Sequence, residues 1–272
     1  MPKRSALIQF LPRYGSIATG VIYILIGSIA LLSLLKLRDG GADESSILAI
    51  LNASIVGQVC IAFILVGLIC FVLWRCYEAI RDPYHYGNTA WGIIKRVGVG
   101  ISSITDLLIA YTAIRIWMGN GNVQVDGQPL EERELAATLL QNPNRAWIVL
   151  TIGIIYSVTS VIQFVYGVTR GYKDRMTMEK ISSRLLITIH SLGIAGYTAR
   201  GFILGIIGFF FMKAYYLKDE NQIVNTDKAF DFIGDNVGHI WFTCIALGTI
   251  CYGLFMIALG ITYKNTAQKE RV

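Results

Sequence analysis

Two charged residues, Asp106 and Arg200, lie inside apolar stretches that are long enough to cross a membrane. A charge at the centre of a bilayer costs at least about 2.5–3.5 kcal/mol, so such a residue usually faces a partner or water. Asp106 and Arg200 could relay protons or ions, and Arg200 could bind an anion. Alternatively, the two could form an ion pair that fixes which helices pack together, or Asp106 could accept hydrogen bonds from neighbouring hydroxyls. A single intramembrane acid and the absence of proline within the spans disfavour a transporter built on broken helices.

The densest group of basic residues follows the fourth apolar stretch. It comprises Arg170, Lys173, Arg175, Lys180 and Arg184. These side chains could bind the head groups of anionic membrane lipids. They could equally serve only as the positive charge that keeps a loop in the cytoplasm.

Histidine and cysteine are placed poorly for a metal or a haem. His85 lies in a loop, and His190 and His239 lie at opposite ends of two spans, whereas a bis-histidine haem needs both ligands at one depth. The five cysteines form no Cys-x-x-Cys pair. The sequence also lacks a phosphate-binding glycine loop and a nucleophile elbow. We therefore expect no cofactor, no metal and no enzymatic activity.

The amino-acid composition indicates which kind of structural element positions these residues. The chain has 272 residues, of which 54% are hydrophobic and only 15% charged, and its mean hydropathy is +0.54. A soluble domain carries about 25% charged residues. The sequence therefore predicts an all-α, polytopic membrane protein in a single membrane domain, residues 1–272. Six apolar runs are long enough to span a bilayer, and they cover residues 14–35, 57–74, 97–118, 146–168, 185–212 and 238–263.

Lysine and arginine are distributed unevenly between the two sides. An even number of spans places both termini on one side, and that side carries 15 of the 24 basic residues, whereas the other carries eight. The positive-inside rule therefore predicts cytoplasmic N- and C-termini. The net charge of +6 reflects this asymmetry, so we expect no nucleic-acid partner.

The spans form three similar helix pairs, predicted as repeats over residues 10–82, 92–170 and 185–264. The second helices carry Gly67, Gly153 and Gly248 at equivalent positions. In the fifth span, Gly201, Gly205 and Gly208 form a small-residue face that allows close helix packing, either within the bundle or with a partner helix. Each pair also encloses a short amphipathic stretch, for which we expect a helix on the outer surface, with Asp43 and Thr226 as N-caps.

Two motifs resemble a known family. The segments 196–201 (GYTARG) and 74–83 (WRCYEAIRDP) are similar to motifs of the bacterial membrane family catalogued as domain of unknown function 1206. The resemblance covers essentially the whole chain, although Thr19 stands where the family's first repeat tends to have arginine. It implies three two-helix repeats and a protein of the bacterial cytoplasmic (inner) membrane, and it implies no activity.

These observations favour a scaffold or accessory subunit of a membrane complex, with membrane lipids and other membrane subunits as partners. Short loops and the absence of a catalytic constellation support this interpretation. A small carrier or channel using Asp106 and Arg200, or a lipid-binding membrane protein, remains as an alternative.

Overall fold

The structure is a computed structural model. It describes residues 2–37, 42–89, 92–93, 96–97, 99–100, 107, 111, 114–115, 118, 129–177 and 182–263. Five of the described helices are long and apolar enough to cross a membrane. They are α1 (Pro2–Leu34), α3 (Ile55–Arg81), α6 (Trp147–Val168), α7 (Ser183–Leu217) and α9 (His239–Thr262). Within the described residues, β pairing is limited to one bridge, between Met176 and Tyr263. The prediction of an all-α polytopic protein is therefore confirmed.

The predicted third span, 97–118, falls largely outside the described residues. The described residues on either side of it lie at opposite ends of the bundle. Arg96 donates hydrogen bonds to the carbonyls of Ala79 and Ile80 near the end of α3. At the other end, Arg133 donates to the carbonyl of Ile223.

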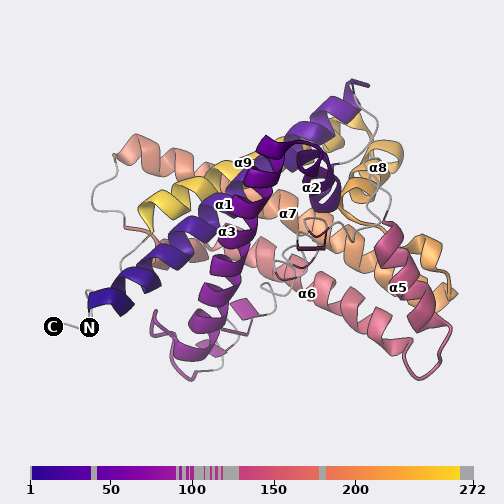
Figure 1. The fold of residues 1–272 in the computed structure, drawn as a ribbon, viewed down its shortest axis with the longest axis horizontal. Helices are drawn as coiled ribbons and strands as arrows, with labels where there is room; N and C mark the ends of the chain where they lie inside the picture. Colours follow the sequence, from indigo (N-terminus) through magenta and orange to yellow (C-terminus); the bar gives the residue numbers. More distant parts are fainter. Residues whose placement is uncertain are drawn as a thin grey trace.

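Three short helices gather at one end of the bundle (Figure 1). They are α2 (Glu44–Asn52), α5 (Leu130–Leu140) and α8 (Thr226–Asn236), and they coincide with the three predicted amphipathic stretches. We call this end the short-helix end. The N-cap of α2 is confirmed, since Asp43 accepts a hydrogen bond from the Ser46 amide. That of α8 is wrong by one residue, because the Asn225 side chain caps the helix by accepting from the Lys228 amide.

The opposite end collects tyrosines and is called the tyrosine end. Here α3, α6 and α9 end and α7 begins. The turn η1 (Gly171–Arg175) lies between α6 and α7. Tyr84, Tyr172 and Tyr263 all lie at this end, and the Tyr84 and Tyr263 hydroxyls are 2.7 Å apart.

Helix α3 runs seven residues beyond the predicted end of its span at Trp74. The sequence suggested an end there because Arg75 follows. In the structure Arg75 and Glu78 are buried, since both point into the bundle rather than toward water. A hydropathy profile cannot separate these two directions, so the apolar run alone did not show that the helix continues to Arg81.

Glycines set the closest helix contacts. A β-carbon on Gly253 of α9 would lie 2.5 Å from the Gly20 carbonyl of α1, and one on Gly260 would lie 2.7 Å from the Arg13 carbonyl. The antiparallel helices α1 and α9 therefore touch backbone to backbone (Figure 1). In a membrane, where lipid tails are as apolar as side chains, such van der Waals contact drives helix association. Extensive contacts between α1 and α9, and between α6 and α7, hold different helix pairs together.

Candidate functional site

Arg200 lies in the middle of α7, and its side chain is only 4% exposed. The guanidinium donates a hydrogen bond to the Tyr252 hydroxyl of α9. It also lies over two aromatic rings, 4.8 Å from the centroid of Tyr23 on α1 and 5.0 Å from that of Tyr252. Three helices thus converge on this charge, and the aromatic faces stabilise it in a setting of low dielectric. Asp106, the other predicted intramembrane charge, lies outside the described residues.

A row of tyrosine rings leads from the tyrosine end toward this arginine. Tyr166 lies 5.0 Å from Tyr197, Tyr197 lies 5.2 Å from Tyr252, and Tyr252 lies 4.9 Å from Tyr23, measured between ring centroids. The interplanar angles are 70°, 80° and 84°, which is edge-to-face packing. Because these rings come from α6, α7, α9 and α1, the row ties all three predicted helix pairs together.

The other end of the row meets a buried ion pair. Arg175 of η1 donates from Nε to the Glu78 Oε1 of α3 at 3.0 Å, and from Nη2 to the same oxygen. Arg175 is 3% exposed and Glu78 is 1% exposed. The guanidinium also lies 5.2 Å from the Tyr166 ring. Burial alone would lower the pKa of Arg175, but the Glu78 carboxylate keeps that pKa well above its usual value.

Hydroxyl and indole groups close the tyrosine end around this pair. The Trp74 indole donates to the Tyr263 hydroxyl at 2.8 Å, and the Tyr84 hydroxyl shares a hydrogen bond with the same oxygen. Burial raises the pKa of Tyr84 and of Tyr263 above the ordinary tyrosine value. Both hydroxyls therefore stay protonated at neutral pH and act as hydrogen-bonding groups rather than as bases.

The chemistry open to this interior follows from its side chains. Arginine carries a permanent charge and donates hydrogen bonds, so it can hold an anion but cannot exchange a proton. The Ser16 and Thr19 hydroxyls, on the inward face of α1, are buried without a hydrogen-bond partner. No cluster of His, Cys, Asp and Glu with metal-binding geometry occurs within the described part of the chain. Among the described interior residues, Arg200 therefore supplies a fixed positive charge and hydrogen-bond donors rather than a group that exchanges protons.

The small-residue face of α7 packs inside the bundle. A β-carbon on Gly208 would lie 2.5 Å from the Ser157 Oγ of α6, and one on Gly201 would lie 3.0 Å from the Phe164 ring. At Gly205 the neighbour is the Ser160 Oγ at 3.0 Å. The Ser160 hydroxyl donates to the Gly201 carbonyl at 2.7 Å. Of the two predicted uses of this face, the structure shows the internal one.

The basic group divides in the structure. Arg170, Lys173 and Arg184 are exposed. Arg175 is buried in the ion pair with Glu78, so no lipid head group can reach it in this fold, and its predicted lipid contact is wrong. Lys180 lies outside the described residues.

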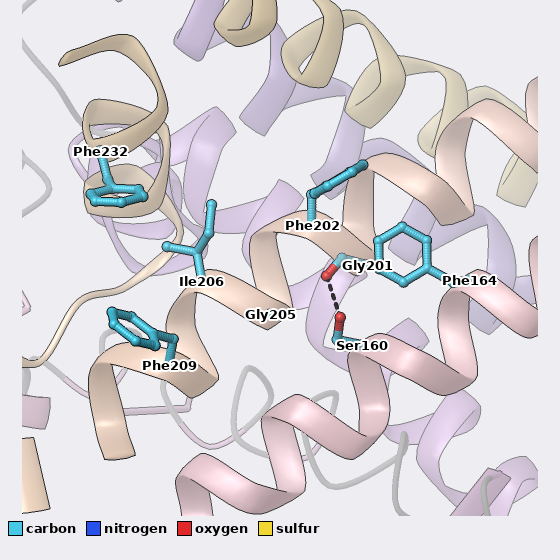
Figure 2. Close-up of a pocket in the computed structure, with 8 residues that line it drawn as sticks. All are labelled: Ser160, Phe164, Gly201, Phe202, Gly205, Ile206, Phe209 and Phe232. Atoms are coloured by element: carbon cyan, nitrogen blue, oxygen red, sulfur yellow. Dashed lines mark hydrogen bonds between the residues drawn. The ribbon is translucent and has the colours of Figure 1, made fainter. Parts of the chain in front are cut away.

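An apolar groove opens on the lateral surface of the bundle (Figure 2). It has a volume of about 390 Å³. Phe202 and Phe209 of α7 are half-exposed along it, and α8 closes one end with Phe232 (Figure 2). The lining residues are Ser160, Phe164, Gly201, Phe202, Gly205, Ile206, Phe209 and Phe232.

Sequence reasoning missed Glu78 and Arg75 as interior residues. One signal was available, since Trp74 and Glu78 are four residues apart and so share a helix face. A buried tryptophan therefore carries the glutamate inward with it. No comparable signal pointed to Arg175, because its position depends on the conformation of a turn.

Together, the apolar helices and the inward-facing polar side chains define a multi-pass helical membrane protein. The family described as Domain of Unknown Function (DUF1206) matches residues 14–82 and again residues 195–263. The two matches cover half of the chain, which therefore belongs to this family. Among curated proteins, the uncharacterized protein YxxB of Bacillus subtilis (strain 168) is 29% identical over 258 residues, which cover 94% of this chain and 92% of the relative. No solved structure matches significantly.

The two family matches are equally long, so in register they pair Gly15 with Gly196 and Phe71 with Tyr252. The structure shows the same contact in both copies. A β-carbon on Gly15 would clash with Phe71, and one on Gly196 would clash with Tyr252. A repeated unit is thus supported by the sequence matches and by packing. The same register pairs Arg200 with Thr19, so the intramembrane arginine belongs to one copy only.

Proposed function

We propose that this protein is a non-enzymatic scaffold or accessory subunit of a membrane complex. The observation that carries the proposal is the contrast between a tightly packed bundle and an open lateral groove. Backbone contacts such as that between Gly20 and Gly253 make the bundle rigid. The groove of α6, α7 and α8 presents phenylalanines to the side, where a transmembrane helix of another subunit can pack against them.

Affinity purification from cross-linked membranes tests this proposal. The tagged chain, extracted in mild detergent, should retain a membrane protein at fixed stoichiometry. Replacing Phe202→Ala together with Phe209→Ala should release that partner. The matched control is Leu73→Ala with Leu254→Ala, which removes similarly exposed apolar side chains from α3 and α9. A chain that elutes only as a monomer would contradict the proposal, and equal retention by groove and control variants would contradict the groove as its contact.

We propose the bacterial cytoplasmic membrane as the location, with both termini in the cytoplasm. The excess of lysine and arginine on the side of the termini supports this orientation. Periplasmic and cytoplasmic reporter enzymes fused to the C-terminus should be inactive and active, respectively. The reverse pattern would refute the orientation.

We propose, as a second candidate, a small carrier for an anion. The buried Arg200 favours it, and so do the Ser16 and Thr19 hydroxyls of α1, which are buried without a hydrogen-bond partner. Thr19 lies one helical turn before Tyr23, the residue of α1 that contacts Arg200. Its test is anion flux into proteoliposomes. A carrier of this kind predicts that flux is lost on Arg200→Gln and changed on Asp106→Asn. Flux that both variants leave unchanged would exclude it.

A further inference from the structure

The interior of the bundle holds more arginine than acid. Three of the described arginines are buried, namely Arg75, Arg175 and Arg200. Of the described buried acids, Asp43 and Asp227 lie at the short-helix end, and only Glu78 lies toward the tyrosine end. The sequence places one further acid within a span, Asp106, which lies outside the described residues. Two acids cannot neutralise three arginines, so the interior keeps one surplus positive charge.

Arg75 of α3 is the arginine that carries this surplus charge. Arg175 binds Glu78 through two nitrogens, and Arg200 donates a hydrogen bond to a tyrosine hydroxyl of α9. Arg75 forms no hydrogen bond and no ion pair within the described part of the chain. Its guanidinium carbon lies 4.7 Å from the centroid of the Phe71 ring. Since a guanidinium carries several N–H donors, Arg75 has donors left for a ligand.

The close contact between α1 and α3 places this guanidinium. A β-carbon on Gly15 of α1 would lie 2.6 Å from the Phe71 β-carbon. Arg75 follows Phe71 by one helical turn, and its side chain runs back over that ring, along the buried face of α3. Arg75 is 8% exposed, and its nitrogens are not among the polar atoms that the bundle encloses completely. The guanidinium therefore keeps surface that a small ligand can reach.

The chemistry of a buried guanidinium determines which ligand fits it. A charge within a membrane bundle is costly without a partner, and the face of the Phe71 ring offsets only part of that cost. An anion offsets more, because it accepts charge-assisted hydrogen bonds. The planar fork of arginine matches two oxygens of one phosphate or carboxylate group, so it favours an oxyanion. Because little of Arg75 is exposed, the oxyanion must be small.

We propose that Arg75 binds a small oxyanion, of the size of inorganic phosphate, in the interior of the bundle beside the contact between α1 and α3. The anion accepts two parallel hydrogen bonds from the guanidinium and neutralises the surplus positive charge. The site does not depend on the proposed scaffold role. It also differs from the sequence-based hypotheses, which assign anion binding to Arg200 and lipid binding to the basic loop.

Titration of the full chain with inorganic phosphate, in detergent and in a buffer free of other oxyanions, tests the site. Calorimetry measures binding, and thermal unfolding measures stability. The parent should bind phosphate, and Arg75→Gln should weaken that binding about tenfold, because it removes two charge-assisted hydrogen bonds. Arg75→Lys keeps the charge without the fork and should bind with intermediate affinity. Without phosphate, Arg75→Gln should be nearly as stable as the parent or more stable, since it removes an uncompensated buried charge.

The matched control is Arg81→Gln, which removes an exposed arginine from the same helix and should leave phosphate binding unchanged. Equal binding by the parent and Arg75→Gln, or an equal loss in both glutamine variants, would overturn the site. A large loss of stability of Arg75→Gln in phosphate-free buffer would also overturn it, because the charge would then already have a partner such as Asp106. Binding of phosphatidylglycerol vesicles through Arg75, without binding of inorganic phosphate, would overturn the small anion and assign Arg75 to a lipid head group.

Discussion

The Glu78 carboxylate of α3 lies against the Arg175 guanidinium of η1, 97 residues further along the chain. Both side chains are buried, so this ion pair joins the end of the first predicted helix pair to the turn that follows the second. Tyrosines surround it, and Tyr84 and Tyr166 both lie close to the arginine. The contact holds the end of α3 against the turn between α6 and α7.

Breaking this pair from one side should destabilise the protein. In Glu78→Gln the arginine stays buried without a compensating charge, and we expect a loss of about 3–5 kcal/mol. Arg175→Gln should cost a similar amount, whereas the two substitutions together should cost less than their sum. Thermal unfolding in detergent measures each value. Additive losses would show that the two charges do not interact.

How far the sequence predicts this arrangement differs between elements. Long apolar runs predict five described spans, because hydrocarbon thickness sets helix length. The sequence does not identify which helices contact one another. Gly201 and Gly208 predict a close helix contact, but they do not indicate that Gly208 packs against Ser157 of α6. Arg175 shows the limit most clearly. In the sequence it belongs to a basic loop, and only the conformation of η1 turns it inward to Glu78.

The predicted repeats show the same division. Gly67 and Gly248 indicate a repeated unit, and their close contacts with Ala18 and Ala199 recur in the structure. The sequence does not reveal contacts between different repeats, such as that of Gly20 with Gly253. Such a contact requires only that both residues are small, and many positions in the spans meet that requirement. The exact limits of the three repeats stay a prediction.

Glycine at the α1–α9 contact should be intolerant of even one added carbon. Gly253→Ala places a methyl group 2.5 Å from the Gly20 carbonyl oxygen, and this backbone atom cannot rotate away. We expect a loss of about 1–3 kcal/mol, as in other overpacked cores. Gly205→Ala is the matched control, because its neighbour is the Ser160 Oγ at 3.0 Å, a side-chain atom that can move. Equal thermal stabilities of the two variants would contradict backbone contact between α1 and α9.

An ion pair between Asp106 and Arg200, as the sequence suggests, makes the stability of the protein depend on both charges. Arg200→Gln would then leave Asp106 buried alone, at a cost of about 3–5 kcal/mol, and adding Asp106→Asn should recover part of that loss. Tyr252→Phe serves as a control, because it removes one hydrogen-bond acceptor of Arg200 and keeps the aromatic ring; it should cost about 1.5–3 kcal/mol. The measurement is a double-mutant cycle of thermal stability. Purely additive effects of the Asp106 and Arg200 substitutions would exclude the pair.

At the short-helix end, Asp227 predicts a dependence of stability on pH. Its Oδ1 accepts a hydrogen bond from the Ala42 amide at 2.7 Å, which joins α8 to the segment before α2. Burial, together with the negative charges of Asp231 and Asp43, raises the pKa of Asp227 to about 6, although the Ala42 amide and the nearby Lys228 act in the opposite direction.

The raised pKa of Asp227 determines whether stability rises or falls with pH. The folded protein binds a proton more tightly than the unfolded chain, whose aspartate titrates near 3.8. The stabilising effect is therefore complete below about pH 4 and is lost as the pH rises through about 6. Asp227→Asn keeps an oxygen for the Ala42 amide and removes the charge. This variant should be more stable than the parent at pH 8, by at most about 3 kcal/mol, and nearly equal to it at pH 4.

Thermal unfolding at pH 4, 6 and 8 measures the effect of Asp227→Asn. Asp219→Asn is the matched control, since Asp219 is also at the short-helix end but its pKa is lowered, chiefly by the hydrogen bond from Gln222. Removing that charge should destabilise the protein at pH 8 rather than stabilise it, because a carboxylate with a lowered pKa favours the folded state above its unfolded pKa. Opposite signs for the two variants at pH 8 distinguish a specific effect of buried Asp227 from a general effect of reducing negative charge at this end. The same sign in both would refute it.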